Sequence, residues 1–385
     1  MSNEPVQFSF PTTVDFGVGA LRNLPKWTGL HGKRALLVTD PGLAELDVFQ
    51  RVRQVLTDAD FPHDVFTAVS PNPLDTEAHE GAKFCRRQGC DVVIGVGGGS
   101  ALDGAKAIAL MATHEGSIVD YDDGTGGCDR IRADVPPVIA IPTTAGTGSE
   151  VGRATVVIDT QRNVKVVVFS PHLMPRVALV DPTLHVGMPG WLTAATGMDA
   201  LTHNVEALLS TGYHPLADAI ALGGIMAVRD GLSRAYSDPT DLNARASMAM
   251  AALMGATAFQ KGLGVIHSLA HPCSTIAGVH HGLANGVLIE TGLRFNREVS
   301  GAALAQMACT LGLPGDTPDQ QADVAIEWVV RLRDDVGIPA RLQEVGVTAD
   351  MLPAMIQQAY LDGCHQSNPR PVSQEQIATL YQSAI

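Results

Sequence analysis

The chain has 385 residues, of which 45% are hydrophobic and 17% charged, and its formal net charge is -14 at pH 7. At roughly 150 residues per domain this length predicts two domains, and the composition is typical of a compact globular enzyme rather than of a disordered or fibrous chain. The negative net charge excludes a general affinity for nucleic acid or anionic membranes, because such affinity requires an excess of basic residues.

The cysteines and the apolar stretches indicate where the protein works. The six cysteines show no C-x-x-C spacing, so we expect them to be reduced and mostly buried. The first 17 residues do not resemble a signal peptide, which has a basic start followed by an apolar run. The longest low-charge stretch, 246–259, is shorter than the roughly 18 to 20 residues of a membrane-spanning helix, so it predicts a buried helix. We expect a soluble, cytoplasmic protein with no membrane partner.

Short aliphatic runs alternate with helical patterns in the first half of the chain. Strands are predicted at 35–39, 63–67 and 91–95, and helices at 45–58 and 76–87. This alternation is typical of a parallel sheet with crossover helices. Further runs at 138–141, 155–158 and 177–180 are expected to continue the sheet.

A glycine-rich turn follows the predicted strand at 91–95 and consists of Gly97, Gly98, Gly99 and Ser100. Because a helical pattern begins at once, backbone N–H groups and the positive end of the helix dipole would favour a pyrophosphate there. The spacing only approximates the dinucleotide-binding fingerprint. A tight turn without a ligand is the alternative.

A second loop of small and hydroxyl residues, 142–150, follows the next predicted strand. It contains Thr143, Thr144, Thr147 and Ser149. Two loops that suit phosphate at the carboxyl ends of strands in one parallel sheet indicate a ligand in the crevice there. A flexible surface loop is the alternative.

Asp40 directly follows the predicted strand at 35–39. A carboxylate at this place could bind the ribose hydroxyls and repel a 2′-phosphate, which favours NAD over NADP. Asn72, between two prolines, could donate to the cofactor. Both residues are also common in ordinary turns, which is the alternative for each.

From about Pro189 the strand pattern ends, and alanine- and leucine-rich helical segments follow at 191–210, 215–234 and 242–257. We therefore predict an α/β dinucleotide-binding domain at 1–187 and an all-helical catalytic domain at 188–385. The crevice between two such domains is the usual place for a substrate.

Six of the thirteen histidines lie between His203 and His281. Asp199 and His203 are four residues apart on a predicted helix, so both side chains project from one face, and His267 and His271 repeat this spacing. Three neutral imidazoles and one carboxylate suit Fe²⁺ or Zn²⁺ and leave a position for substrate. A single core histidine, in contrast, is usually only a satisfied polar group.

Several segments together resemble the iron-containing (group III) alcohol dehydrogenases. They are 97–100, 142–150, 197–206, 265–272, 281–285 and 362–370, in the order found in that family and over nearly the whole chain. The resemblance implies a Rossmann-like domain followed by a helical domain, an architecture shared with dehydroquinate synthase. It also implies NAD and Fe²⁺ as cofactors, with Zn²⁺ as the alternative metal.

The same resemblance implies roles for individual residues. The metal ligands would be Asp199, His203, His267 and His281. His267 and His271 would be the catalytic residues, with His271 near the nicotinamide as a proton relay, since imidazoles titrate near neutral pH. The residues expected to bind the cofactor are Asp40, Asn72, Gly97, Gly98, Gly99, Ser100, Asp103, Thr143, Thr144, Thr147, Ser149 and Lys165.

The implied activity is the metal-dependent, NAD(H)-linked interconversion of a small primary alcohol and its aldehyde, with the metal as a Lewis acid, in a homo-oligomer. Lys261 departs from the family, which mostly has small or amide residues at this position. It could face the substrate and select an anionic semialdehyde, or it could be a solvated lysine at a helix end. A reductase of an acidic semialdehyde or of maleylacetate is therefore an alternative.

Glycerol dehydrogenase and dehydroquinate synthase share the architecture but use a shorter ligand set. The lyase also needs a phosphate pocket rich in lysine and arginine, which the helical half does not obviously contain. A non-catalytic NAD-binding scaffold would be free to lose ligands, yet all four positions are filled. The oxidoreductase is therefore the preferred interpretation.

Overall fold

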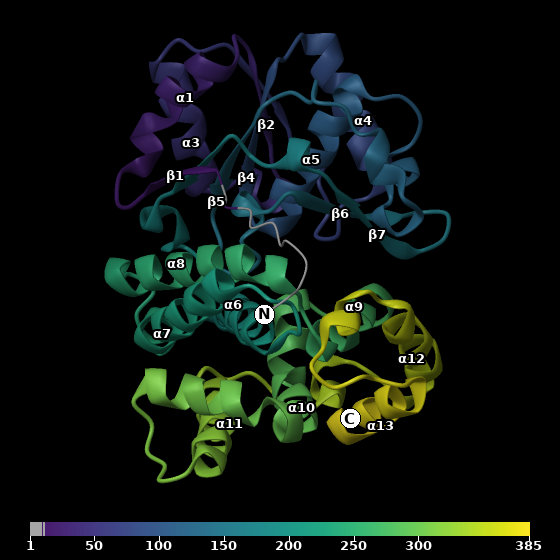
Figure 1. The fold of residues 1–385 in the computed structure, drawn as a ribbon. Helices are drawn as coiled ribbons and strands as arrows, with labels where there is room; N and C mark the ends of the chain where they lie inside the picture. The colour runs from purple at the N-terminus through teal and green to yellow at the C-terminus, as the bar shows by residue number, and fades with distance from the viewer. Residues whose placement is uncertain (1–9, 11) are drawn as a thin grey trace. The chain divides into compact units, whose positions relative to one another are not determined.

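The computed structural model describes residues 10 and 12–385, and the chain forms two compact units (Figure 1). The sheet unit contains residues 12–144 and Gly148–Gly187. The helical unit contains Ala145–Thr147 and Met188–Ile385. The main division of the chain thus falls between Gly187 and Met188.

The sheet unit is built on six parallel strands in the order β1-β8-β5-β4-β2-β3. These strands are β1 (Thr13–Phe16), β2 (Ala35–Val38), β3 (His63–Phe66), β4 (Val92–Gly97), β5 (Val138–Pro142) and β8 (Val177–Val180). The chain first runs outward from β2 to β3 and then returns to place β4 on the other side of β2. In parallel sheets, ligands bind where the connections diverge in this way.

Helices cover both faces of this sheet. They are α1 (Leu24–His31), α2 (Pro41–Ala44), α3 (Asp47–Asp58), α4 (Asp75–Gln88) and α5 (Gly99–Thr113). Leu37 and Ile94 pack in one cluster with α1 and α3, whereas Leu36 and Val93 pack in another with α4 and α5. The four inner strands β2, β4, β5 and β8 are buried along their whole length and consist mostly of aliphatic residues, as expected for a parallel sheet covered on both faces. The edge strands β1 and β3 are only partly buried and contain polar residues.

The prediction for 155–158 is wrong in one respect. This segment forms a strand, β6 (Ala154–Asp159), but it pairs antiparallel with β7 (Val164–Phe169) in a separate two-stranded sheet. Only four residues connect the two strands, whereas a parallel crossover needs a dozen or more. Strands β1 and β7 were not predicted from the sequence.

The described part of the helical unit contains no strand, so the predicted all-helical half is confirmed. Its helices are α6 (Gly190–Leu209), α7 (Pro215–Ser237), α8 (Leu242–Ala258), α9 (Val265–Ala277), α10 (His281–Leu311), α11 (Pro318–Asp335), α12 (Leu352–Leu361) and α13 (Gln374–Ala384). Within the described residues no single helix meets the length and hydropathy expected of a membrane span, although the bent pair Leu242–Lys261 and Val265–Ala277 does so when taken together.

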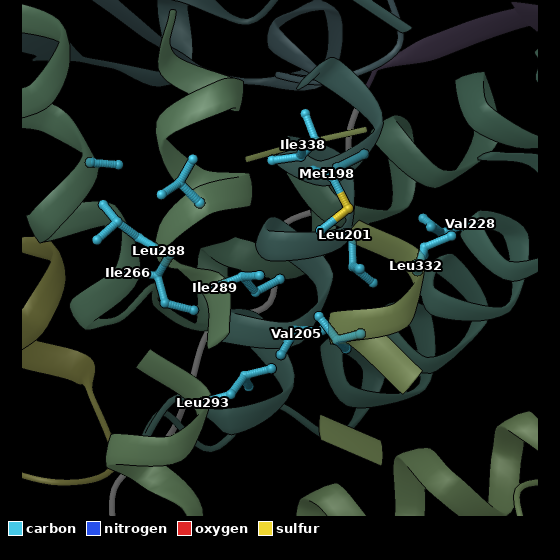
Figure 2. Packing of buried hydrophobic residues seen from close by; sticks show 14 of the residues in the cluster. Met198, Leu201, Val205, Val228, Ile266, Leu288, Ile289, Leu293, Leu332 and Ile338 are labelled. Carbon is cyan, nitrogen blue, oxygen red and sulfur yellow. The ribbon is translucent and has the colours of Figure 1, made fainter. Parts of the chain in front are cut away.

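Helix α6 runs through the core of the helical unit. Figure 2 shows its side chains Met198, Leu201 and Val205 in the same hydrophobic cluster as Ile266 of α9 and Leu288 of α10. From Thr193 to Leu209 every residue of α6 is buried. A helix that is buried all round brings its polar residues into the core as well, where they need partners.

Candidate functional site

Four donors converge in the helical unit, and we call them the four-donor cluster: Asp199, His203, His267 and His281. They come from α6, α9 and the first residue of α10, and their ligand atoms all lie within 4.8 Å of one another. Asp199 Oδ1 is 4.0 Å from His203 Nε2 and 3.6 Å from His281 Nε2. Two atoms each about 2.1 Å from one ion are at most about 4.2 Å apart, so both distances suit a shared ion.

Glycines let the helices that carry these donors approach one another. A Cβ on Gly282 would lie 3.0 Å from the Cβ of Asp199 and would collide with the backbone of Ala195. A Cβ on Gly255 of α8 would lie 2.9 Å from the Cβ of His203. Larger residues at these two positions would therefore push the donors apart.

Asn285 offers a test of whether a cation fits among the four donors. Its Nδ2 donates to Asp199 Oδ1 at 2.7 Å and lies 3.3 Å from His267 Nε2 and 3.2 Å from His281 Nε2. One positively polarised N–H group thus meets three of the four donors, which indicates that their lone pairs point to a common centre. The buried Oδ1 of Asn285 has no hydrogen-bond partner among the residues that the structure describes.

Burial sets the charge of His203. It lowers the pKa of this imidazole to about 4, although nearby Asp199 acts in the opposite direction. The ring is therefore neutral at pH 7, as a metal ligand must be. At His267 burial also opposes protonation, but contact with Glu206 outweighs it and raises the pKa.

Glu206, on α6, orients His267. Its Oε2 is 2.5 Å from His267 Nδ1, and its Oε1 accepts the backbone N–H of Ile266 at 2.7 Å. When Nδ1 donates to this carboxylate, Nε2 keeps its lone pair for a metal. A Cβ on Gly264 would lie only 2.7 Å from Oε1, so the glycine makes room for the carboxylate.

His271, one turn further along α9, has its own carboxylate. Its Nδ1 is 2.7 Å from Asp362 Oδ2, and its ring stacks on that of His281 with centroids 5.2 Å apart. Burial opposes ionisation of Asp362, but contact with His271 outweighs burial and holds the pKa of this carboxyl well below its usual range. His271 is not one of the four donors, so it is available for a different role.

In the sheet unit, Asp40 and the glycine turn lie at neighbouring strand ends. Asp40 follows β2 and caps α2 by accepting the N–H of Leu43 at 2.8 Å. Gly97 ends β4 with φ 145°, and a Cβ there would lie 2.6 Å from that of Ala101 and 4.0 Å from Asp40 Oδ2. The two features thus flank the place where the chain connections diverge.

The start of α5 has the properties of an anion site. Gly99 is its first residue, and the N-cap Gly98 has no side chain to bind the first N–H groups. Thr143 and Thr144 follow the neighbouring strand β5, and a Cβ on Gly98 would lie 3.3 Å from Thr144 Oγ1. Ser100 donates to the carbonyl of Pro71, next to Asn72.

The remaining predicted cofactor residues are placed differently. Ser149 Oγ is 2.5 Å from Asp103 Oδ1 and 2.7 Å from the buried Lys106 Nζ, so all three belong to a network inside the sheet unit. Lys165 lies on β7, and Thr147 belongs to the helical unit. Cofactor contacts by Asp103, Ser149, Lys165 and Thr147 stay predictions.

Lys261 is not the solvated lysine that one interpretation of the sequence expects. Its Nζ is 2.5 Å from Asp218 Oδ1 and 2.9 Å from the carbonyl of Leu208, and its side chain is only 6% exposed. The solvated lysine is therefore wrong, and the ammonium is already paired within the protein. The family resemblance assigns no chemistry to His214 or His280, and both have structural roles. His214 caps α7, and His280 packs edge-on against Trp191.

Glu206 and Asp362, the partners of the histidines, were not predicted from the sequence. Glu206 lies three residues after His203, so the helix spacing that relates Asp199 to His203 could have placed it beside the cluster. Asp362 opens the C-terminal segment 362–370, but nothing local connects it with His271, which is 91 residues away in sequence.

Comparisons with known proteins agree with this geometry. The family described as iron-containing alcohol dehydrogenase matches residues 11–182, and the C-terminal part of the Fe-containing alcohol dehydrogenase family matches 193–385. A 4-hydroxybutyrate dehydrogenase of Cupriavidus necator is 40% identical over 94% of both chains. An NAD-dependent methanol dehydrogenase of Bacillus methanolicus is 35% identical over 98% of this chain and 99% of its own.

A solved structure of 1,3-propanediol oxidoreductase superposes with a TM-score of 0.95 at 37% identity, over 99% of this chain and 100% of that one. The predicted fold class and the predicted metal-dependent oxidoreductase activity on alcohols or aldehydes are confirmed. The chain belongs to the iron-containing alcohol dehydrogenase family.

Proposed function

We propose that the protein interconverts a short primary alcohol and its aldehyde with NAD(H), and that Asp199, His203, His267 and His281 hold a divalent iron. The observation that supports this most is the convergence of four ligand atoms within 4.8 Å, on three helices of a buried core. The donor set of one carboxylate and three imidazoles suits Fe²⁺, with Zn²⁺ as the alternative.

When bound, iron supplies a Lewis acid and NAD supplies the hydride carrier. The chain's own residues supply orientation and proton movement. Glu206 fixes His267 with Nε2 toward the other donors, and Asp362 fixes His271 beside His281. A histidine held in this way, next to the donors but outside them, is suited to carry the alcohol proton to solvent.

We further propose that residues 1–187 bind the dinucleotide and residues 188–385 carry the metal and the catalytic histidines. Asp40, Asn72, Gly97 to Ser100, Thr143 and Thr144 are the best-supported cofactor residues, because they follow the adjacent strands β2, β4 and β5 or lie beside these loops. Assembly as a homo-oligomer in the cytoplasm is part of the same proposal. Sedimentation analysis of the purified protein tests the assembly.

The experiment for the proposed function is anaerobic purification with metal analysis, followed by an aldehyde panel monitored by NADH absorbance. We expect about one iron per chain and NADH consumption with short aldehydes. Phosphate release from a phosphorylated substrate without net NADH change would instead indicate a lyase and contradict the proposal.

A second candidate substrate is an acidic semialdehyde, which the similarity to a 4-hydroxybutyrate dehydrogenase favours. Lys261 is not the expected selector, because its ammonium is paired with Asp218. We expect the ratio of kcat/KM for an anionic and a neutral aldehyde to be the same in wild type and Lys261→Ala. A ratio that falls in the variant would restore Lys261 as a substrate contact.

A further inference from the structure

A second group of metal-ligating side chains adjoins the four-donor cluster. His271 of α9, Asp362 directly after α12, and Cys364 at the start of the 3-10 helix Cys364–Ser367 offer ligand atoms that all lie within 4.8 Å of one another. All three residues are half-buried, with side-chain exposures of 26% for His271 and 19% for Asp362. An ion from solvent can therefore reach them.

We propose that His271, Asp362 and Cys364 form a second metal site, which takes zinc and thereby inhibits the enzyme. A thiolate sulfur, an imidazole nitrogen and a carboxylate oxygen are the three donor types that Zn²⁺ uses in proteins. Mg²⁺ and Ca²⁺ take oxygen ligands instead. The four-donor cluster contains no sulfur, so the second site has the softer donors and the greater preference for zinc.

Hydrogen bonds hold this second site in place before any ion arrives. Asp362 Oδ1 accepts the hydroxyl of Ser268 and the backbone N–H of Cys364, both at 2.8 Å. Ser268 in turn accepts the backbone N–H of His365 at 2.9 Å. The carboxylate and the backbone of Cys364 are thus fixed relative to α9.

The ligand atoms need only small movements to bind one ion. Around tetrahedral Zn²⁺, with bonds of about 2.0 to 2.3 Å, neighbouring ligand atoms lie roughly 3.3 to 3.8 Å apart. The 2.7 Å separation of His271 Nδ1 and Asp362 Oδ2 would widen by about 1 Å. Zinc binding would release the thiol proton of Cys364 to solvent, since the thiolate is the ligand.

Inhibition follows from the proton relay assigned to His271, and this step rests on the proposed function. The hydrogen bond between His271 and Asp362 orients the imidazole beside His281. An ion that binds this pair replaces the hydrogen bond and occupies the imidazole, so the relay stops. Zinc would therefore inhibit while iron stays in the four-donor cluster.

Cobalt tests the site directly, because a thiolate bound to Co²⁺ gives a charge-transfer absorption in the near ultraviolet that nitrogen and oxygen ligands do not give. We expect the iron-loaded enzyme to bind one further equivalent of Co²⁺ with this absorption. Cys364→Ser should abolish it, and Cys309→Ser, which changes an exposed cysteine of α10, should keep it. No thiolate absorption, or one that survives in Cys364→Ser, would overturn the site.

Zinc inhibition tests the consequence. We expect the zinc concentration that halves turnover to rise at least ~10-fold in Cys364→Ser, since loss of even indirect partners weakens metal binding by that factor. It should not change in Cys309→Ser, and the iron content should stay constant throughout. Equal inhibition of both variants, or inhibition that is proportional to the loss of iron, would refute the proposal that zinc inhibits from the second site. Failure of the proposed function is recognised separately, as absent turnover before zinc is added.

Discussion

The four-donor cluster depends on side chains, whereas the strand ends of the sheet unit depend mainly on backbone groups. In the cluster, side chains from three helices meet, and buried partners such as Glu206 fix their orientation. At the strand ends, the important groups are backbone N–H groups and glycines without side chains. A single substitution in the cluster should therefore abolish iron binding, whereas a substitution at the strand ends should only weaken NAD binding.

The largest effect is expected for His267→Ala, which removes one of the four donors. Iron content and kcat should both fall by more than ~100-fold, because loss of a mere partner of a ligand already costs 10- to 100-fold. Metal analysis and NADH-linked turnover measure the two quantities. His280→Ala is the matched control, since His280 neighbours His281 but packs on Trp191. If His267→Ala kept both iron and turnover, the assigned ligand set would be wrong.

Glu206→Gln should have the next largest effect. An amide can still accept the N–H of Ile266 through its oxygen, but its NH₂ group then faces His267 Nδ1 and favours the tautomer with a proton on Nε2. We expect iron affinity to fall about 10- to 100-fold in a chelator competition.

Asn368→Ala is the control for Glu206→Gln. Asn368 Oδ1 accepts the N–H of Val265 at the same helix start, at 3.1 Å, and among the described residues its hydrogen bonds go to groups other than His267. This variant should lower the thermal stability but change iron affinity much less. Equal losses of affinity in both variants would mean that Glu206 only supports the start of α9.

The contrast between the two sites also explains what the sequence could predict. The glycine turn after β4 and the spacing of Asp199 and His203 are local patterns, so the sequence alone is enough to place both. The pairs His267–Glu206 and His271–Asp362 join residues 61 and 91 positions apart. Helix spacing could place Glu206 on the same face of α6 as His203, but neither pairing is encoded locally, because the packing of α6, α9 and α12 brings the partners together.

The wrong predictions for β6 and Lys261 also arise because residues outside the local segment decide the structure. The segment β6 has the local features of a strand, but the four-residue connection to β7 decides its sheet, and β7 was not predicted. Lys261 is charged and follows a helix, so its local sequence allows a solvated lysine, which is the alternative that the structure contradicts. The carboxylate of Asp218, 43 residues away in sequence, instead pairs with it.

Gly97→Ala should weaken NAD binding at the strand ends without abolishing it. The added Cβ would lie 2.6 Å from that of Ala101, at a φ of 145° that L-residues rarely adopt. Strain of about 1 to 3 kcal/mol would weaken NAD binding by roughly 10- to 100-fold, as measured by NADH fluorescence titration. Iron content should stay unchanged. Gly152→Ala, where the nearest atom is 3.6 Å away, should bind NAD normally. A Gly97→Ala variant with wild-type affinity would exclude a role for this turn.

The smallest effect on catalysis is expected for Glu150, a buried carboxyl of the sheet unit that contrasts with Glu206. Burial raises the pKa of Glu150 from 4.5 to about 7, although Lys106 acts in the opposite direction. Between these two pH values the unfolded chain has lost the proton and the folded chain has kept it, so the free energy of unfolding falls as pH rises from about 4.5 to 7. Glu150→Gln should remove this fall, so its stability relative to wild type should rise by roughly 2 to 3 kcal/mol between pH 5 and pH 8, since each pKa unit corresponds to about 1.4 kcal/mol. Urea unfolding at both pH values measures the difference, and a gain that is the same at pH 5 and pH 8 would show that Glu150 stays ionised beside Lys106.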